Sequence, residues 1–276
     1  MKKYGKDIGS EESWNQMAQS YVDRLSSEYH NHRLAVINAL IPEELYQEGR
    51  RIFDFGCGDA VLFEQFLKKG SRISGMDISA EMVALARQRL SRMNADPDLI
   101  SVGGASALTH LPDDSLDAIL SFNVLAYLME DEEALFYKEA YRLLRPGGYL
   151  IVTHSNELFD MYSLNQYTIE FFAHHLVQDR GLREPLRALV TNASEAESIN
   201  TYNVRENPLT YRFKLARYGF VEQRQEFVNL HTAPPPLLPK DKSYPDTLSW
   251  KEEDKWKLMF ICSTYGSQSI RKASGS

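Results

Sequence analysis

The residues best suited to chemistry stand in one short run, Asp54-Phe55-Gly56-Cys57-Gly58-Asp59, which closes a β-prone segment beginning at Arg51. Glycines in a turn after a strand let the backbone approach a ligand closely. A helix that follows such a turn adds partial positive charge at its N-terminus. The two acids beside the turn would repel a pyrophosphate group and attract a ligand that carries an amino group and a sulfonium but no phosphate. The run therefore favours S-adenosylmethionine.

A third acid, Asp77, stands 23 residues after Asp54, at the end of the next β-prone segment. A carboxylate at this place accepts hydrogen bonds from both hydroxyls of a ribose. A nicotinamide dinucleotide site is the alternative, but its fingerprint has a third glycine where this sequence has Val61. The acidic glycine turn and Asp77 together indicate a nucleoside cofactor without a pyrophosphate.

The elements that must position these residues alternate between strand and helix. The strand signals are at 51–55, 72–76, 99–102, 116–122 and 149–153, and the helical patterns are at 62–69, 80–93 and 132–144. Ser79 is placed to cap the helix at 80–93. This alternation predicts a doubly wound α/β sheet with helices on both faces. A turn is expected at Pro146-Gly147-Gly148, and the chain should end with a helix at 210–218 and strands at 221–230 and 256–265.

Four segments resemble the class I S-adenosylmethionine-dependent methyltransferases of the small-molecule type: Ile52 to Ala60, Gly75 to Ser79, Leu116 to Ile119 and Leu144 to Leu150. The resemblance covers roughly residues 45–155, and the closing helix and strands match the usual end of the family. It implies a Rossmann-like seven-stranded sheet with an antiparallel last strand and a helical cap. In that family the turn with Asp54, Gly56 and Gly58 holds the methionine part, Asp77 holds the ribose, and Ile78 packs on the adenine.

The resemblance implies further cofactor contacts. After the third strand such enzymes often have Asp-Ala, whose acid binds the adenine amino group, and here Ser106 and Ala107 are the nearest equivalents. A serine hydroxyl accepts that hydrogen bond more weakly than a carboxylate does. Asn123, after the fourth strand, and Tyr21, in a helix near the N-terminus, are also expected at the cofactor. Tyr127 is a candidate for the acceptor pocket or for packing at a helix start.

A general base is needed only if the methyl acceptor arrives protonated. His154, directly after the fifth strand, is the best placed of the seven histidines, with a structural role as the alternative. His174 and His175 would reach the site only if their helix is a lid. No histidine has the carboxylate or cysteine spacing of a metal site.

Composition sets the remaining expectations. The 276 residues carry a net charge of −7, which speaks against nucleic acid, and two cysteines, which fit a reduced cytoplasmic setting. We expect a soluble protein without signal peptide or membrane segment. It should form a single domain, 1–276, which comprises cap helices at 10–45, a cofactor-binding core at 46–156, a helical insert at 157–207, and a helix and strand pair at 208–270.

The function predicted from these observations is methyl transfer to oxygen or nitrogen of a small metabolite, sugar or natural-product scaffold. Two alternatives stay open, a non-catalytic cofactor-binding protein on the same fold and a protein methyltransferase. The acceptor and the oligomeric state are left undetermined by the sequence.

Overall fold

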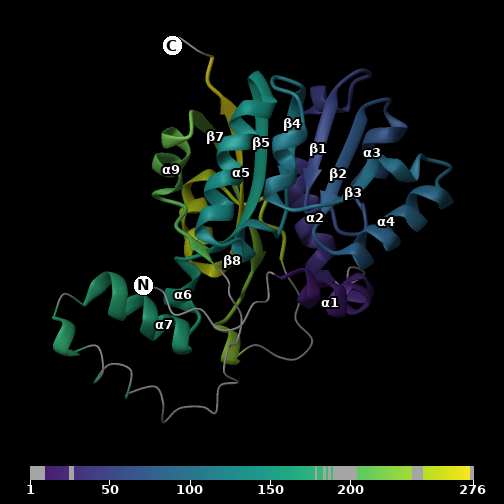
Figure 1. Ribbon diagram of the computed structural model, residues 1–276. Helices are drawn as coiled ribbons and strands as arrows, with labels where there is room; N and C mark the ends of the chain where they lie inside the picture. The colour runs from purple at the N-terminus through teal and green to yellow at the C-terminus, as the bar shows by residue number, and fades with distance from the viewer. Residues whose placement is uncertain are drawn as a thin grey trace.

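A mixed sheet runs through the centre of the molecule in the computed structural model, which describes residues 10–24, 28–177, 179–182, 185, 188, 204–237 and 245–273. Its main path has the order β3-β2-β1-β4-β5-β8-β7, and β6 pairs with β5 (Figure 1). The strands from β3 to β5 are parallel, and β8 is antiparallel to both β5 and β7. The strands are β1 (Arg51–Phe55), β2 (Arg72–Asp77), β3 (Ile100–Val102), β4 (Leu116–Ser121), β5 (Leu144–Asn156), β6 (Arg205–Glu206), β7 (Phe220–Leu230) and β8 (Cys262–Arg271). The expected Rossmann-like fold with an antiparallel last strand is confirmed.

Helices lie on both faces of the sheet, and α1 and the α6–α7 pair lie at the same end of the molecule (Figure 1). The α-helices are α1 (Glu11–Arg24), α2 (Glu28–Leu40), α3 (Phe63–Lys68), α4 (Ala80–Arg92), α5 (Glu130–Leu143), α6 (Phe159–Tyr162), α7 (Gln166–Phe171), α9 (Tyr211–Arg217) and α10 (Leu258–Ile261). Ser79 caps α4 as predicted, because its Oγ accepts a hydrogen bond of 3.1 Å from the N–H of Met82.

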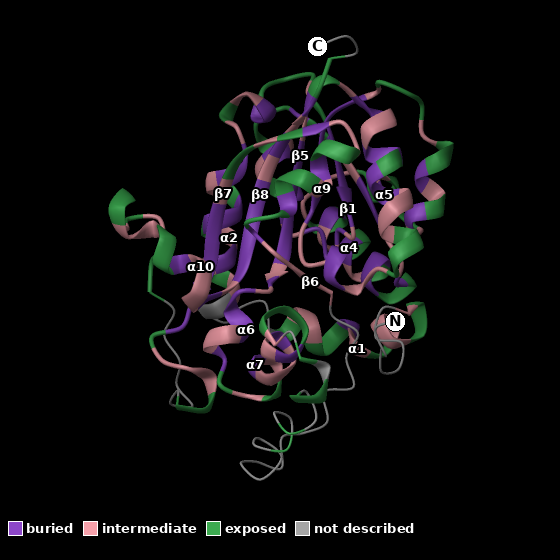
Figure 2. Cartoon of the chain, turned by 90° about the vertical axis from the view of Figure 1, so that its left-hand side faces the viewer, coloured by how far each residue is buried: buried purple, intermediate pink, exposed green. Residues whose placement is uncertain are grey.

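The core consists of two apolar clusters, and neighbouring residues of a strand contribute to different ones. Ile52 belongs to the cluster that contains Phe63 and Phe66, whereas Phe53 and Phe55 belong to the other. All six residues of β4 are buried, as expected for a parallel strand covered on both faces. Figure 2 shows the buried strands between helices whose outer sides are exposed.

The segment 157–204 leaves the sheet at β5 and returns to it at β6. There Ser155 pairs with Arg205, and Asn156 pairs with Glu206. Just before β6, the N–H of Val204 donates a hydrogen bond of 2.6 Å to the carbonyl of Ala126, beyond the end of β4. Both ends of this excursion are therefore fixed at the same end of the sheet. The polar stretch at 191–203 lies outside the described residues.

Two predicted elements were wrong. The expected strand at 256–265 begins with helix instead, a 3-10 helix at Glu252–Lys257 followed by α10, and β8 starts only at Cys262. A short apolar run fits a strand and a buried helix equally well, so its pattern does not separate them. The expected turn at 146–148 lies inside β5, where the register against β4 shifts.

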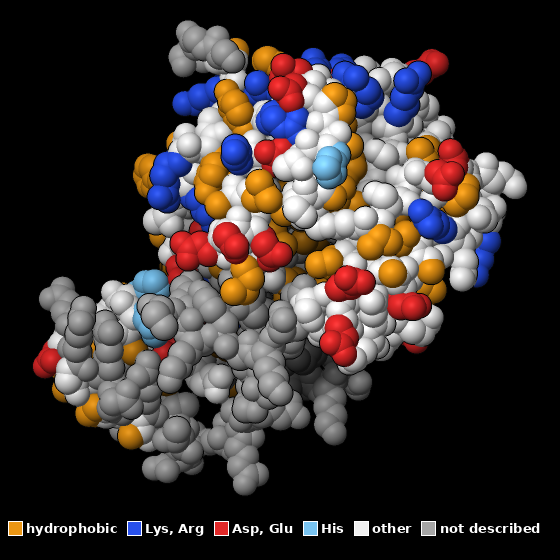
Figure 3. All heavy atoms as spheres, viewed as in Figure 1, with side chains coloured by type: hydrophobic (Ala, Val, Ile, Leu, Met, Phe, Trp, Pro, Cys, Tyr) orange, Lys and Arg blue, Asp and Glu red, His pale blue; other side chains and the backbone are white. Residues whose placement is uncertain are grey.

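The surface carries both signs of charge. On the face shown in Figure 3, Lys and Arg side chains gather mainly towards the end that holds the C-terminus, and acidic side chains extend towards the α1 end. Within the described ranges, no helix combines the length and the apolar character needed to cross a membrane.

Candidate functional site

A cleft opens where the carboxyl ends of β1 and β4 lie side by side. The chain order reverses between these two strands, and in open α/β sheets ligands bind at such a point. The space between its walls measures about 1210 Å³, with the open mouth included. Its walls come from the loops after β1 to β4 and from α1, α2 and α5. The lining residues include Trp14, Tyr21, His30, Arg33, Leu34, Ile37, Asp54, Gly56, Gly58, Asp59, Asp77, Ile78, Gly103, Gly104, Ala105, Phe122, Asn123, Tyr127 and Glu132.

The glycine turn after β1 forms the floor of the cleft. Gly56 has φ +74°, and a Cβ there would collide with the side chain of Val124. Gly58 has φ +53°, but a Cβ there would meet no atom within 4 Å, so this backbone faces open space. The N–H groups of Gly56 and Cys57 both donate to the carbonyl of Met76, which ties the turn to β2. The predicted close approach of backbone to ligand is available at Gly58.

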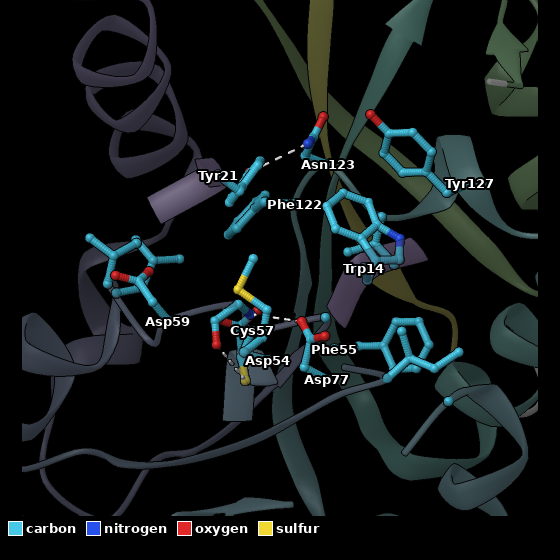
Figure 4. Close-up of a pocket in the computed structure, with 18 of the residues that line it drawn as sticks. Trp14, Tyr21, Asp54, Phe55, Cys57, Asp59, Asp77, Phe122, Asn123 and Tyr127 are labelled. Atoms are coloured by element: carbon cyan, nitrogen blue, oxygen red, sulfur yellow. Dashed lines mark hydrogen bonds between the residues drawn. The ribbon is translucent and has the colours of Figure 1, made fainter. Parts of the chain in front are cut away.

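Two carboxylates, Asp54 and Asp77, lie next to this turn (Figure 4). The Asp77 carboxylate accepts hydrogen bonds of 2.9 Å from the N–H groups of Gly58 and Ser79. Burial raises the pKa of Asp54 to about 7, and the negative charge of Asp77 contributes to the rise. Burial also raises the pKa of Asp77, although its two hydrogen bonds oppose the rise. The pair is therefore a buried acidic site that a cationic ligand would stabilise.

The second acid of the turn has a different environment from the one expected. Asp59 is buried and forms an ion pair with Arg89 of α4. Its charge is thereby compensated within the chain. The acid that acts together with Asp54 is Asp77, on the neighbouring strand.

At the β2–β3 end the cleft is lined by Ile78, as predicted, and by Gly103, Gly104 and Ala105. Ser106 and Ala107 are not among the lining residues, and Ser106 is exposed. The reason is that a 3-10 helix starts at Ala105 and turns the next residues away. Ser106 and Ala107, predicted to contact the adenine, therefore lie outside the cleft, and the backbone just before them lines it.

Aromatic side chains of α1 and of the β4 end lie above the acidic pair in Figure 4. Trp14 contacts Tyr127 edge to face, with ring centroids 5.2 Å apart. The Tyr21 hydroxyl accepts a hydrogen bond of 3.5 Å from Nδ2 of Asn123. Asn123 itself has φ +61°, and its N–H donates to Oγ1 of Thr153 over 2.8 Å. Such a strained residue, held by its neighbours, is typical of functional sites, and the structure brings the predicted Tyr21 and Asn123 together.

One face of α2 completes the wall, and the sequence analysis missed it. His30, Arg33, Leu34 and Ile37 line the cleft at the helical spacing of three and four residues. Arg33 is 7% exposed. The sequence signal was present, because Leu34 and Ile37 follow the same period, but an apolar helical face usually indicates core packing alone.

The predicted catalytic residue His154 lies outside the cleft. It is 4% exposed, and its ring packs between Tyr211 and Tyr265 at centroid distances of 4.3 and 5.2 Å. Burial, and secondarily the charge of Lys214, lower the pKa of His154 well below its ordinary value. The role predicted for His154 is wrong, because its side chain points from β5 into the core. His174 and His175 are also outside the cleft, and Nε2 of His175 lies 3.0 Å from Glu157.

Comparison with known proteins places this site in a family. Residues 53–152 match the model of a methyltransferase domain. A Mycolicibacterium smegmatis protein named "Probable S-adenosylmethionine-dependent methyltransferase" is 32% identical over 110 residues, which are 40% of each chain. The ubiquinone biosynthesis O-methyltransferase of Paracidovorax citrulli is 23% identical over 191 residues, covering 67% of this chain and 77% of that protein.

Solved structures agree on the fold. Magnesium protoporphyrin IX methyltransferase of Synechocystis, solved with bound SAH, has a TM-score of 0.58 at 13% identity and covers 95% of this chain and 98% of its own. The [4+2]-cyclase SpnF has a TM-score of 0.60 at 15% identity, with coverage of 99% and 100%. The matched domain, the sheet order and the cleft with its acidic glycine turn agree: residues 53–152 form a methyltransferase domain, and the chain is similar to S-adenosylmethionine-dependent methyltransferases.

Proposed function

We propose that the protein transfers the methyl group of S-adenosylmethionine to an oxygen of a small, planar acceptor. The observation that carries this proposal is the pairing of the buried carboxylate of Asp54 with the half-buried carboxylate of Asp77, beside a glycine turn that leaves backbone exposed to the cleft. The two carboxylates and the glycine turn attract a cationic ligand and would repel a pyrophosphate.

The residues of the cleft match the charged and polar groups of that cofactor. The ammonium of the methionine part would meet Asp54, and its carboxylate would meet the buried guanidinium of Arg33. The ribose hydroxyls would donate to Asp77. The adenine would lie against Ile78 and the backbone of Gly104, which both line the cleft.

Asn123 and Tyr21 are proposed to hold the cofactor near its reacting end, because they meet at the tip of β4. When bound, the cofactor supplies an activated methyl group, so the protein's main task is to position the acceptor. Trp14, Phe122 and Tyr127 provide apolar ring surfaces for that purpose and exclude water. Oxygen is favoured as the methylated atom because the relatives that align over most of their length are named as O-methyltransferases.

Calorimetric titration tests the proposal. The protein should bind S-adenosylmethionine and its thioether product and should not bind a nicotinamide dinucleotide. Asp77→Ala should weaken binding of S-adenosylmethionine by about 1–3 kcal/mol, because it leaves ribose hydroxyls without an acceptor. Asp98→Ala, at an exposed acid outside the cleft, is the matched control. Tight binding of a dinucleotide instead would refute the proposal.

A role other than methyl transfer is the second candidate, favoured by one observation: the neighbour SpnF, with the same fold, is named as a [4+2]-cyclase. Binding of the cofactor without methyl transfer to a broad panel of phenols, amines and peptides would support it. Methylation of peptides alone would instead indicate a protein methyltransferase.

A further inference from the structure

His30 holds a position that no other histidine of the chain shares. All seven histidines lie within the described ranges, and among them His30 alone lines the cleft. His32 faces β7, where its Nδ1 accepts a hydrogen bond from the N–H of Asn229. The others are buried in the core, paired with Glu157 or exposed: His154, His231, His175, His110 and His174.

The surroundings of His30 connect it to the tip of β4. Its ring packs edge to face against Tyr21, with centroids 5.8 Å apart. The Tyr21 hydroxyl in turn meets Asn123 at the end of β4, at the point where β1 and β4 diverge. One aromatic side chain thus separates the imidazole from the residue that we place at the reacting end of the cofactor.

We propose that His30 is the general base of the reaction and that the acceptor is a phenol or an enol hydroxyl on a planar ring. This inference rests on the proposed function and adds the class of acceptor and the residue that activates it. The acceptor ring would lie against Trp14, Phe122 and Tyr127, with its hydroxyl directed to His30. A hydroxyl, unlike a neutral amine, needs to lose its proton when the new bond forms.

The atoms balance in a single displacement. His30 takes the hydroxyl proton on an imidazole nitrogen, and the acceptor oxygen forms the O–CH3 bond with the released electron pair. The S–CH3 bond breaks with its electrons on sulfur, which converts the sulfonium into the neutral thioether of S-adenosylhomocysteine. His30 then returns the proton to solvent after the products leave.

The other ionisable groups that face the cleft are Tyr21 on α1, Arg33 on α2, Asp54, Cys57 and Asp59 in the glycine turn, Asp77 on β2, Tyr127 after β4 and Glu132 on α5. Three of the carboxylates already have partners: Asp59 has Arg89, Asp77 has two backbone N–H groups, and Glu132 accepts from the N–H of Met129. Asp54 lies beside Asp77 at the end where the cofactor's cation binds. His30 lies on the acceptor side of the cleft, next to Tyr21.

Three variants test this role: His30→Gln, which keeps a polar side chain without a base, His30→Ala with added imidazole, and His110→Gln as a matched control at an exposed histidine. Methyl transfer is measured on ring-substituted phenols of graded acidity. His30→Gln should lower kcat by about 10²- to 10⁴-fold on the least acidic phenol, and by less on the most acidic one, because an already ionised acceptor needs no base. The acid limb of the wild-type kcat–pH profile should disappear, and imidazole should partly rescue His30→Ala.

Two readouts do not depend on turnover. The Kd for S-adenosylmethionine should be the same in His30→Gln as in the wild type. In the presence of S-adenosylhomocysteine, 4-nitrophenol should bind to the wild type as the coloured phenolate and to His30→Gln as the colourless phenol. His110→Gln should match the wild type in every measurement.

The proposal is overturned if His30→Gln keeps kcat within about twofold, if it loses cofactor affinity as strongly as Asp77→Ala does, or if the wild type methylates amines but no phenol. These outcomes differ from failure of the proposed function, in which the wild type itself binds no S-adenosylmethionine.

Discussion

The two ends of the sheet use aspartate in opposite ways. At the amino end of the strands, Asp117 lies 3.1 Å from Arg50 and 2.5 Å from Arg145, and it accepts a hydrogen bond of 2.8 Å from the N–H of Arg51. Burial alone would raise its pKa, but these partners outweigh burial and lower it. At the carboxyl end, Asp54 is equally buried, has Asp77 as its charged neighbour, and has a pKa raised to about 7.

This comparison separates a structural carboxylate from a ligand-binding one. Asp117 obtains its countercharges from its own chain, so its charge stabilises the fold. Among the described residues, the charged group that acts on Asp54 is the carboxylate of Asp77, so the ionisation of Asp54 costs folding free energy until a cation arrives in the cleft. Mutations at the two aspartates should consequently have opposite effects on stability and on binding.

The largest effect is expected for Asp54→Asn. This variant should bind S-adenosylmethionine about 10- to 150-fold more weakly, because a charge-assisted hydrogen bond of about 1.5–3 kcal/mol is lost. Its free energy of unfolding near neutral pH should stay equal or rise, since a buried and repelled charge is removed. Calorimetry gives the affinity, and urea unfolding gives the stability. Lower stability with unchanged affinity would contradict the comparison.

Asp117→Ala should show the reverse. Removal of this carboxylate leaves Arg50, Arg145 and a backbone N–H without their acceptor, which should lower the free energy of unfolding by about 1–3 kcal/mol. The affinity for S-adenosylmethionine should match the wild type in the folded protein. Loss of binding without loss of stability would mean that Asp117 belongs to the site.

The raised pKa of Asp54 makes cofactor binding dependent on pH. The pKa of Asp54 is about 7 in the folded protein and 3.8 ordinarily. Ionised Asp54 therefore destabilises the fold fully above pH 7, and this effect fades as the pH falls towards 3.8. A bound cation lowers the pKa and releases a proton, so affinity should increase from about pH 6 to about pH 8. Titrations in buffers of different ionisation enthalpy should detect that proton, and Asp54→Asn should not release it.

The smallest effect is expected for Ser106→Ala. The side chain is exposed and outside the cleft, so both affinity and stability should change by less than about 0.5 kcal/mol. A tenfold loss of cofactor affinity would restore the contact predicted from the sequence.

The sequence predicts most residues on the cofactor side of the cleft and few on the acceptor side. The turn at Asp54 to Gly58 and the acid at Asp77 are recognisable because chain neighbours share a strand end, and a parallel sheet brings such ends together. His30 and Arg33 come from a helix remote in sequence, and only packing decides that their face covers the cleft. The catalytic role predicted for His154 is wrong because side chains alternate along a strand. This alternation places the His154 side chain in the core, between two tyrosines.

Packing between elements remote in sequence also decides which parts of the fold the sequence predicts. The strands β1 to β5 were identified within a few residues, and β1, β2 and β3 are each followed by a glycine turn or a capped helix. The helix at 252–261 was not, because its buried face is formed only when it packs beside α6 and β7.

The hydrogen bond of Val204 with Ala126 and the pairing of β6 with β5 have a consequence for how relatives of this protein could diverge. Together they close the excursion at 157–204 into a loop whose two ends are anchored to the sheet. Insertions and replacements within that loop leave the registers of β1, β2 and β4 unchanged. The walls of the cleft come from other segments, so changes within the excursion leave the described cofactor site in place.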